Sequence, residues 1–290
     1  MEASSRESLV RVRERLAELT REPSGLLERT KDRLTREPRV STADELTSLA
    51  DELFAVARLL DGQLTLRRSL SDPAGKPDER AALANRLFAS RVSPAGLDLV
   101  EAVARQRWSR PPDLVEAFMA LAIEASLDAA DARGELDSVE DELFRFGRIV
   151  GGDRELGRIL SDRKAPAEGK AALLDRLLSG KVSPITEQLL RNVLTGPHAG
   201  HADAAIERLS DLASRRRGQS MARVTSAVAL TAAQEERLTD VLGRLYGRNV
   251  ELQVIVDPSV IGGLIVQVGD EVIDGSIAHR LEAAQRRLAG

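Results

Sequence analysis

The sequence has no cysteine, few aromatic residues and no long apolar run. The absence of cysteine excludes disulfides, thiolate nucleophiles and cysteine-ligated metal sites. No apolar run approaches the roughly 18 residues that a membrane-spanning helix needs. The first residues lack the apolar core and the cleavage site of a signal peptide. The sequence therefore predicts no disulfide framework, no secretion signal and no direct membrane span.

The charge balance argues against a nucleic-acid partner. The formal net charge is −4 and aromatic residues make up 2% of the chain, whereas nucleic-acid-binding surfaces are basic and often offer aromatic rings for stacking. The short basic run from Arg215 to Arg217 is typical of a helix C-terminus, where cations meet the negative end of the helix dipole. We therefore predict no nucleic-acid partner.

The residues that are abundant favour helices. Charged residues make up 30% of the sequence, and Leu, Ala, Arg and Glu are common. This composition predicts a mainly helical chain with a well-solvated surface, and its length is sufficient for about two domains.

Residues 250–273 carry the alternation of β-strands. Apolar side chains occupy every second position, in a first strand at Val250, Leu252, Val254 and Val256 and in a second at Leu264, Val266 and Val268. The segments 257–259 and 269–271 separate the strands as turns, because Pro, Gly, Asp and Ser favour turns. Val272 and Ile273 form a short return.

Helices flank these strands. Residues 221–228 form a predicted strand, and Thr231 and Gln234 form a capping box for a helix that carries Leu238, Val241, Leu242 and Leu245. Asp274 or Ser276 caps a final helix whose apolar face contains Ile277, Leu281, Ala284 and Leu288. The sequence thus predicts a small α+β domain, residues 219–290, in the order strand, helix, strand, strand, helix.

The preceding part of the chain contains an internal duplication with an offset of ninety positions. Identical residues recur in pairs that include Glu52 and Glu142, Phe54 and Phe144, and Ser93 and Ser183. Roughly two in five positions are identical over about 50 residues, which exceeds chance for this composition. We therefore predict two copies of one helical bundle, residues 1–110 and 111–218, with Phe54 and Phe144 in matching core positions.

Each copy is predicted to consist of short amphipathic helices. In the second copy they span residues 113–133, 136–150, 154–160, 166–178, 184–194 and 202–217, with breaks at 151–152, 161–162 and 180. Ser93-Pro94 and Ser183-Pro184 begin equivalent helices as N-cap and first helical position. The first copy has an extra helix, residues 8–19, whose apolar stripe packs either on the bundle or on a partner helix. The fold class is mainly α with a small α+β C-terminal domain.

No cluster of residues has the pattern of an active site. His198 and His201 are three positions apart, but His279 is a poor third ligand for zinc. The pair Gly262-Gly263 lacks the lysine and the hydroxyl residue of a phosphate-binding loop. We therefore predict no catalytic residue, no cofactor and no metal.

Two further features have mainly structural explanations. Asp257, Asp270 and Asp274 fall at turns and at a helix cap, where Asp is common, so a carboxylate cluster for acid-base work is disfavoured. Trp108 lies among arginines and is either a packing residue or an anchor for a partner.

The C-terminal pattern resembles the signature of the ATP synthase delta subunit family, called the oligomycin-sensitivity-conferring protein in mitochondria. That signature runs as a strand, an Asp-x-x-hydrophobic turn, a Gly-Gly pair, a second strand and Gly-Asp-x-Val-Ile-Asp-Gly-Ser. The matching residues are Asp257, Gly262, Gly263, Gly269, Asp270, Asp274, Gly275 and Ser276. The six helices of the second copy also match the family, and the extra copy resembles the long form of actinobacterial delta subunits.

The resemblance implies a non-catalytic subunit of the peripheral stalk of a proton-translocating ATP synthase. Such a subunit joins the catalytic alpha subunits of the head to the b subunit, resists rotational drag, and lies peripherally at the cytoplasmic face of the cell membrane. In the family, a groove between the first and fifth helices of the bundle receives a helix of the alpha subunit. The residues thus implied are Leu114, Phe118, Leu121 and Ala125 on the first helix and Leu190, Val193 and Leu194 on the fifth. A stand-alone helical adaptor is the alternative.

Overall fold

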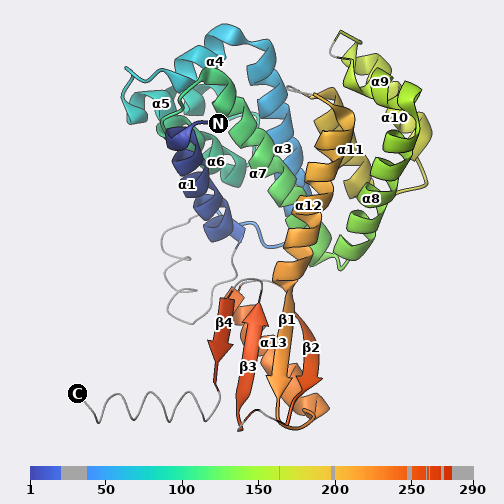
Figure 1. The fold of residues 1–290 in the computed structure, drawn as a ribbon. Helices are drawn as coiled ribbons and strands as arrows, with labels where there is room; N and C mark the ends of the chain where they lie inside the picture. Colours follow the sequence, from blue (N-terminus) through green and yellow to red (C-terminus); the bar gives the residue numbers. More distant parts are fainter. Residues whose placement is uncertain are drawn as a thin grey trace. The chain divides into compact units, whose positions relative to one another are not determined.

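A computed structural model describes residues 1–20, 38–162, 164–196, 200–246, 250–258, 260, 262–268 and 271–275. The described chain divides into two compact units, a helical unit that extends to Asp211 and a C-terminal unit that begins at Leu212. The division falls within one continuous helix, α12. Figure 1 shows helices throughout the first unit and a sheet in the second. The predicted fold class, mainly α with a small α+β domain, is confirmed.

The helical unit is built from helices of 8 to 22 residues. In chain order they are α1 (Ala3–Thr20), α3 (Ala43–Gly62), α4 (Leu64–Ser71), α5 (Pro77–Phe88), α6 (Pro94–Arg105), α7 (Pro111–Ala132), α8 (Leu136–Gly152), α9 (Arg154–Ser161), α10 (Ala167–Leu178), α11 (Pro184–Thr195) and α12 (Ala202–Ser220). The six helices predicted for the second copy are all present, within a few residues of the predicted bounds.

The duplication is visible in the helix bounds. The bounds of α4, α5 and α6 recur ninety positions later in α9, α10 and α11, residue for residue. Ser93 and Ser183 cap α6 and α11, since their hydroxyls accept hydrogen bonds from the amides of Gly96 at 3.1 Å and Thr186 at 3.2 Å. The predicted N-caps are therefore confirmed.

One predicted break is displaced. The helix α8 continues through Gly151 and ends at Gly152, with Asp153 as its C-cap. The Asp153 carboxylate then caps α9 by accepting hydrogen bonds from the amides of Glu155 and Leu156, both at 3.0 Å. Glycine lowers helix propensity without forbidding a helix, whereas a side chain that satisfies the first amides defines where the next helix begins.

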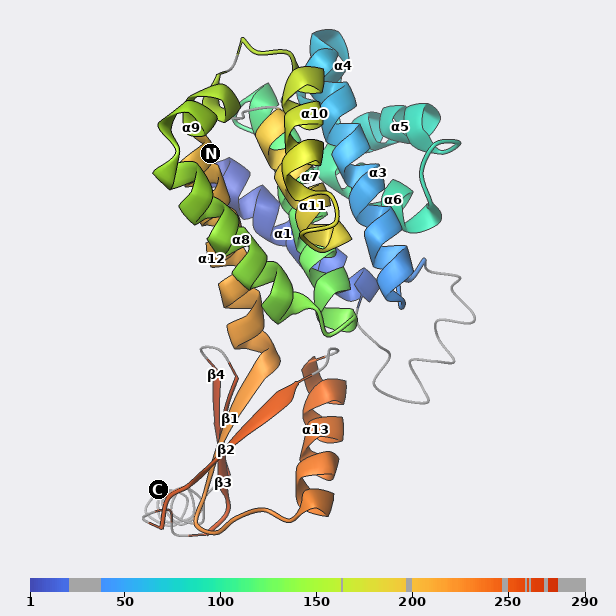
Figure 2. The same cartoon turned by 90° about the vertical axis from the view of Figure 1, so that its right-hand side faces the viewer.

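The centre of the helical unit is α7. Every residue from Pro111 to Asp131 is buried or half-buried, including its five carboxylates, so other parts of the chain surround this helix on all sides. Its neighbours are α1, α3, α4 and α6 from the first copy and α8 and α11 from the second (Figure 2). It is thus both the last helix of the first copy and the first helix of the second. The boundary between the two copies at residue 110 stays a prediction from the sequence repeat, because α7, which follows it, packs on helices of both copies.

The two phenylalanines of the repeat are not equivalent. Phe54 on α3 is 1% exposed, whereas Phe144 on α8 is 58% exposed, so the prediction of matching core positions is wrong. On α3, Ala50 and Ala57 flank Phe54 and are fully buried. The corresponding residues of α8 are Glu140 and Gly147. A glutamate in place of Ala50 limits the close helix approach that small side chains allow, so only α3 buries its phenylalanine.

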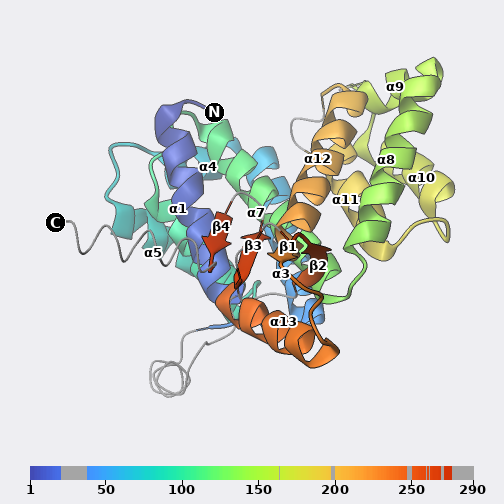
Figure 3. The same cartoon turned by 60° about the horizontal axis from the view of Figure 1, so that its bottom comes forward.

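The C-terminal unit contains a four-stranded sheet with the order β2-β1-β3-β4. Its elements are β1 (Met221–Ser226), α13 (Ala232–Tyr246), β2 (Glu251–Val256), β3 (Leu264–Val268) and β4 (Glu271–Asp274). The pair β1–β2 is parallel, with Val224 opposite Val254, and the pairs β1–β3 and β3–β4 are antiparallel. Figure 3 shows α13 along one face of the sheet, as the parallel β1–α13–β2 crossover requires.

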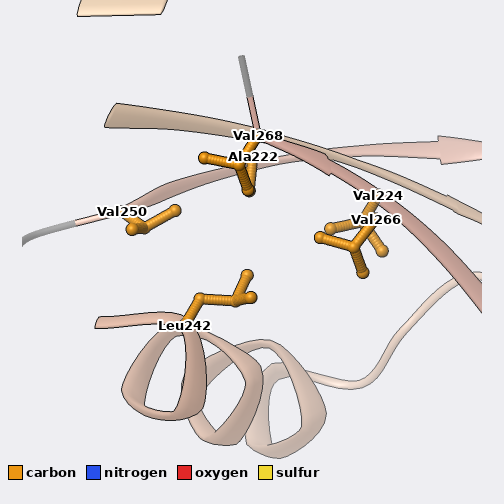
Figure 4. Close-up of a cluster of buried hydrophobic side chains, with 6 residues drawn as sticks. All are labelled: Ala222, Val224, Leu242, Val250, Val266 and Val268. Carbon is orange, nitrogen blue, oxygen red and sulfur yellow. The ribbon is translucent and has the colours of Figure 1, made fainter. Parts of the chain in front are cut away.

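The core of this unit lies between α13 and the sheet. Six side chains form it: Ala222, Val224, Leu242, Val250, Val266 and Val268 (Figure 4). The predicted capping box begins α13, since Thr231 and Gln234 exchange hydrogen bonds of 2.9 and 3.3 Å. The predicted apolar face of α13 is only partly buried, because Val241 and Leu245 are 45% and 57% exposed.

Val272 and Ile273, predicted as a short return of the chain, belong to a strand, β4. The predicted order of strand, helix, strand, strand and helix did not include this strand. The predicted final helix lies outside the described residues.

Candidate partner-binding site

The seven candidate head-binding residues lie on α7 and α11, two helices that contact each other. We call this set the α7–α11 seam: Leu114, Phe118, Leu121 and Ala125 on α7, with Leu190, Val193 and Leu194 on α11. Six of them are at most 1% exposed, and Val193 is half-buried. As the chain stands, the seam is therefore part of its core. An alanine at Phe118 or Leu190 removes core packing and is expected to cost about 2–5 kcal/mol of stability.

The seam is bordered by α3 of the first copy. The amide of Gln188 on α11 donates to the carboxylate of Asp51 on α3 at 2.6 Å. One helical turn further along α11, the Asn192 side-chain carbonyl accepts a hydrogen bond from the guanidinium of Arg58. Because both contact points advance in the same direction along the chain, α3 and α11 run parallel at this contact.

The same helix is tied to the end of α7. The guanidinium of Arg133, which follows α7, donates to the carboxylate of Asp44 at 2.8 Å and to the hydroxyl of Thr47 at 3.2 Å. The start of α3 therefore lies at the end of α7, and the two helices run antiparallel. Together these contacts place α3 against both helices of the seam.

The first helix, α1, packs on α6 and α7. Its Ser5 hydroxyl donates to the carboxylate of Asp113 at 2.8 Å, and both residues are fully buried. The guanidinium of Arg110 donates to the other oxygen of Asp113 at 2.9 Å. Val12, Leu16 and Leu19 of the predicted stripe are buried in the same interface. Of the two expectations for this stripe, packing on the bundle is the one observed.

An ion pair fastens the other end of α1. Arg15 donates to both oxygens of Asp98 on α6, at 2.7 and 2.8 Å, and this carboxylate raises the pKa of the Arg15 guanidinium. The sequence pattern alone did not distinguish Ser5, Asp113 and Arg15 as contact residues. The available signal was that Ser5 and Ser8 lie on the same helix face as Val12, Leu16 and Leu19.

A buried cation occupies the same position in both copies. Arg80 is 4% exposed and donates to backbone carbonyls of Asp72, Gly75, Ala104, Arg105 and Gln106 at 2.5 to 3.0 Å. Ninety positions later, Lys170 is 5% exposed and donates to the carbonyl of Leu160 at 2.8 Å. Burial lowers the pKa of both side chains. Each cation satisfies carbonyls at helix ends, which is a structural role.

The signature glycines occupy the turn between β2 and β3. Gly262 and Gly263 have φ angles of 64° and 84°, a region that side chains other than glycine rarely adopt. Gly275 donates to the carbonyl of Leu264 at 2.9 Å, and a Cβ there would lie 3.1 Å from the same oxygen. Positive φ at Gly262 and Gly263 and the close approach at Gly275 are backbone reasons for glycine at these positions.

Two acidic residues of the signature, Asp257 and Asp274, lie in a turn and in a strand. Asp257 begins the turn and donates from its amide to the carbonyl of Ser226 at 2.8 Å, whereas Asp274 lies in β4 opposite Ile265. Gly269, Asp270 and Ser276 lie outside the described residues.

The histidines, acids and tryptophan that the sequence singled out lie partly within the described residues. They contain no group of three or more His, Asp or Glu side chains that could hold a metal. His201 is exposed, and His198 and His279 lie outside the described part. Trp108 is 4% exposed and donates to the carbonyl of Val103 at 3.0 Å, so it is a packing residue. In the same described ranges, no helix has the length and apolarity needed to cross a membrane.

Comparison with known proteins identifies the family. Residues 123–288 match the family model described as ATP synthase delta (OSCP) subunit. The chain is 45% identical to ATP synthase subunit delta of Streptomyces griseus over 290 residues, which cover all of both chains. It is 46% identical to that of Streptomyces coelicolor, covering 100% of this chain and 98% of the relative. The subunit of a Parafrankia species is 42% identical over 99% of each chain.

These relatives share the full length of the chain, so the duplicated region is part of the similarity and not an unrelated addition. The family match also includes the turn that contains Gly262 and Gly263. The chain therefore belongs to the ATP synthase delta (OSCP) family, as a non-catalytic component of the peripheral stalk of ATP synthase.

Proposed function

We propose that this chain joins the catalytic alpha subunits of the head to the b subunit of the stalk, with the helical unit contacting the head and the C-terminal unit contacting b. The observation that carries the proposal is the full-length similarity to ATP synthase delta subunits, combined with the division into two compact units of different construction. A linker between two large partners needs two separate contact regions, and two linked contacts hold more firmly than either alone because the second is intramolecular.

The packing of the helical unit suits a static load. Its core runs continuously from α1 through α7 to α11, and salt bridges and hydrogen bonds such as Arg15–Asp98 and Ser5–Asp113 join helices that are distant in sequence. Close-packed interiors have low compressibility and transmit strain. Such a body resists the drag that rotation of the central shaft exerts on the head. In this role the chain lies at the cytoplasmic face of the cell membrane, held there through its partners.

The α7–α11 seam is the surface that the family resemblance proposes for the head. Val193 is its half-buried member and the rest is enclosed by neighbouring helices.

Removal of the chain from the complex tests the proposed function. In membranes depleted of this subunit, the catalytic head is expected to appear in the soluble fraction, with ATP hydrolysis no longer coupled to proton pumping. Adding the purified full-length chain should restore membrane-bound, coupled hydrolysis. Retention of a coupled head in depleted membranes would contradict the proposal, and would favour a stand-alone adaptor that is not required by the complex.

A further inference from the structure

We infer that α3 occupies the α7–α11 seam as a permanent part of the fold, so that the head docks on another surface of the helical unit. This inference rests on the proposed function and concerns which surface the head uses. Its basis is that the duplication supplies, within one chain, a helix that fills the seam of the second copy.

The first observation is the face that α3 turns inward. Ala50, Phe54 and Ala57 lie one turn apart on α3, and their exposed fractions are 0%, 1% and 0%. In the equivalent stripe on α8, Glu140 and Gly147 are half-buried and Phe144 is 58% exposed. The burial of this stripe is therefore not a property of the repeated unit. It arises where α3 lies against α7, a helix rich in alanine.

The second observation is a row of polar contacts along one side of that stripe. Asp51 and Arg58 bond to Gln188 and Asn192 on α11, and Asp44 bonds to Arg133 at the end of α7. These pairs join residues that are 134, 137 and 89 positions apart in the chain. They belong to the contact between the copies, because each pair joins α3 to the second copy.

These observations distinguish two arrangements of the seam: one in which α3 stays in place, and one in which a partner helix replaces it. For a partner helix to enter it, α3 would have to leave, which would expose apolar side chains on both α3 and α7 and break three side-chain links. The partner would have to replace all of these contacts to leave the free energy unchanged. A helix that is already in place and continuous with the core satisfies them at no cost in association entropy.

A cross-link that locks α3 to α11 tests the inference. The chain has no natural cysteine, so Asp51→Cys with Gln188→Cys creates one reactive pair, which a short thiol-specific linker joins. The matched control is Asn85→Cys with Glu101→Cys, a pair that joins α5 to α6 within the first copy and whose native side chains are 2.7 Å apart. Binding of the full-length chain to the purified catalytic head is measured before and after cross-linking, and thermal melting verifies that each variant is folded.

The expected result is an affinity for the head that changes less than twofold when either pair is joined. A loss of tenfold or more for the Asp51/Gln188 pair alone would overturn the inference, because it would show that α3 must move for the head to bind. Failure of the unlinked variants and of the unmodified chain to bind the head would instead refute the proposed head contact, and the inference with it. The two failures are therefore distinguishable.

Discussion

The carboxylate of Glu142 on α8 accepts hydrogen bonds from the amide of Ser183, the residue that caps α11, with both of its oxygens at 3.0 Å. Ninety positions earlier, Glu52 accepts from the amide of Ser93 at 2.9 Å and from its hydroxyl at 2.8 Å. In each copy a carboxylate on the second helix thus satisfies the N-terminus of the fifth, where the helix dipole favours negative charge. The duplication preserves a tertiary contact and not only a helix pattern.

Loss of either carboxylate is expected to destabilise the helical unit. Glu52→Gln and Glu142→Gln retain the shape of the side chain but lose the charge-assisted hydrogen bonds, which should lower the free energy of unfolding by about 1–2 kcal/mol each. Urea denaturation followed by circular dichroism measures this. Glu207→Gln, at an exposed position of α12, is the control and should change stability by less than about 0.5 kcal/mol. Equal effects at all three positions would show that the contacts to Ser93 and Ser183 contribute nothing.

The two phenylalanines of the repeat should respond differently to the same substitution. Phe54→Ala creates a cavity at a position that is 1% exposed and is expected to cost about 3–5 kcal/mol. Phe144→Ala removes a side chain that is 58% exposed and should change stability by no more than about 0.5 kcal/mol. Each variant is the control for the other in a thermal or urea denaturation series. Similar losses from both would mean that α8 buries its second stripe as α3 does.

Replacement of the buried cations should cost more in the first copy than in the second. Arg80→Met removes a donor from five carbonyl oxygens, of which only that of Asp72 also accepts from the amide of Gly75 among the described bonds, whereas Lys170→Met removes a donor from one. We expect losses of about 3 kcal/mol or more and about 1–2 kcal/mol respectively, because each unsatisfied buried group carries its own desolvation penalty. Arg80→Lys should recover only part of the loss, since an ammonium has fewer donors and no fork. A full recovery would show that charge alone matters at this position.

The capping box of α3 predicts a stability that depends on pH. Backbone amides of Ser41 and Thr42 donate to the Glu45 carboxylate and lower its pKa below the usual 4.5. Because the folded-state pKa is lower than the unfolded one, this stabilisation is complete above pH 4.5 and is lost as the pH falls through the folded value. Glu45→Gln should therefore be less stable than the parent by about 0.3–1 kcal/mol at neutral pH.

Denaturation curves recorded from neutral pH down to acid check this. The gap between Glu45→Gln and the parent should narrow as the pH falls. A gap of constant size would show that the charge of Glu45 does not contribute.

Glycines with positive φ should not tolerate a side chain. Gly262→Val and Gly263→Val place a β-branched residue at φ angles of 64° and 84°, which is expected to destabilise the C-terminal unit by about 1–3 kcal/mol. Gly169→Ala in α10 is the opposite case, because nothing lies within 4 Å of the added Cβ and the site is helical. It should stabilise by about 0.5–1 kcal/mol. Unchanged melting of both valine variants would contradict the turn geometry.

The sequence by itself determined the local features of this protein. The helix bounds of the second copy, the caps at Ser93 and Ser183, the strand alternation around Val266 and the turn after Val256 were all predicted from it. Each depends on residues within a few positions of one another, such as a hydroxyl that reaches the amide three positions on, or a proline that lacks an amide donor. The family signature is equally local, which is why it could be identified before the fold.

Only the tertiary structure decided which helix faces meet. The pattern of α7 indicates a helix that is mostly buried, but it does not reveal that α7 packs on helices of both copies. Likewise, two phenylalanines at equivalent positions of the repeat differ in burial: Phe54 lies in the core and Phe144 is exposed to solvent. That outcome depends on Ala50 and Glu140, one turn away, and on the neighbour that each helix meets across the fold. Periodicity reports that a face is buried, whereas the identity of its partner is set by long-range packing and by the space that small side chains leave. The seam between α7 and α11 is therefore a pattern in the sequence, and its cover by α3 is a property of the fold.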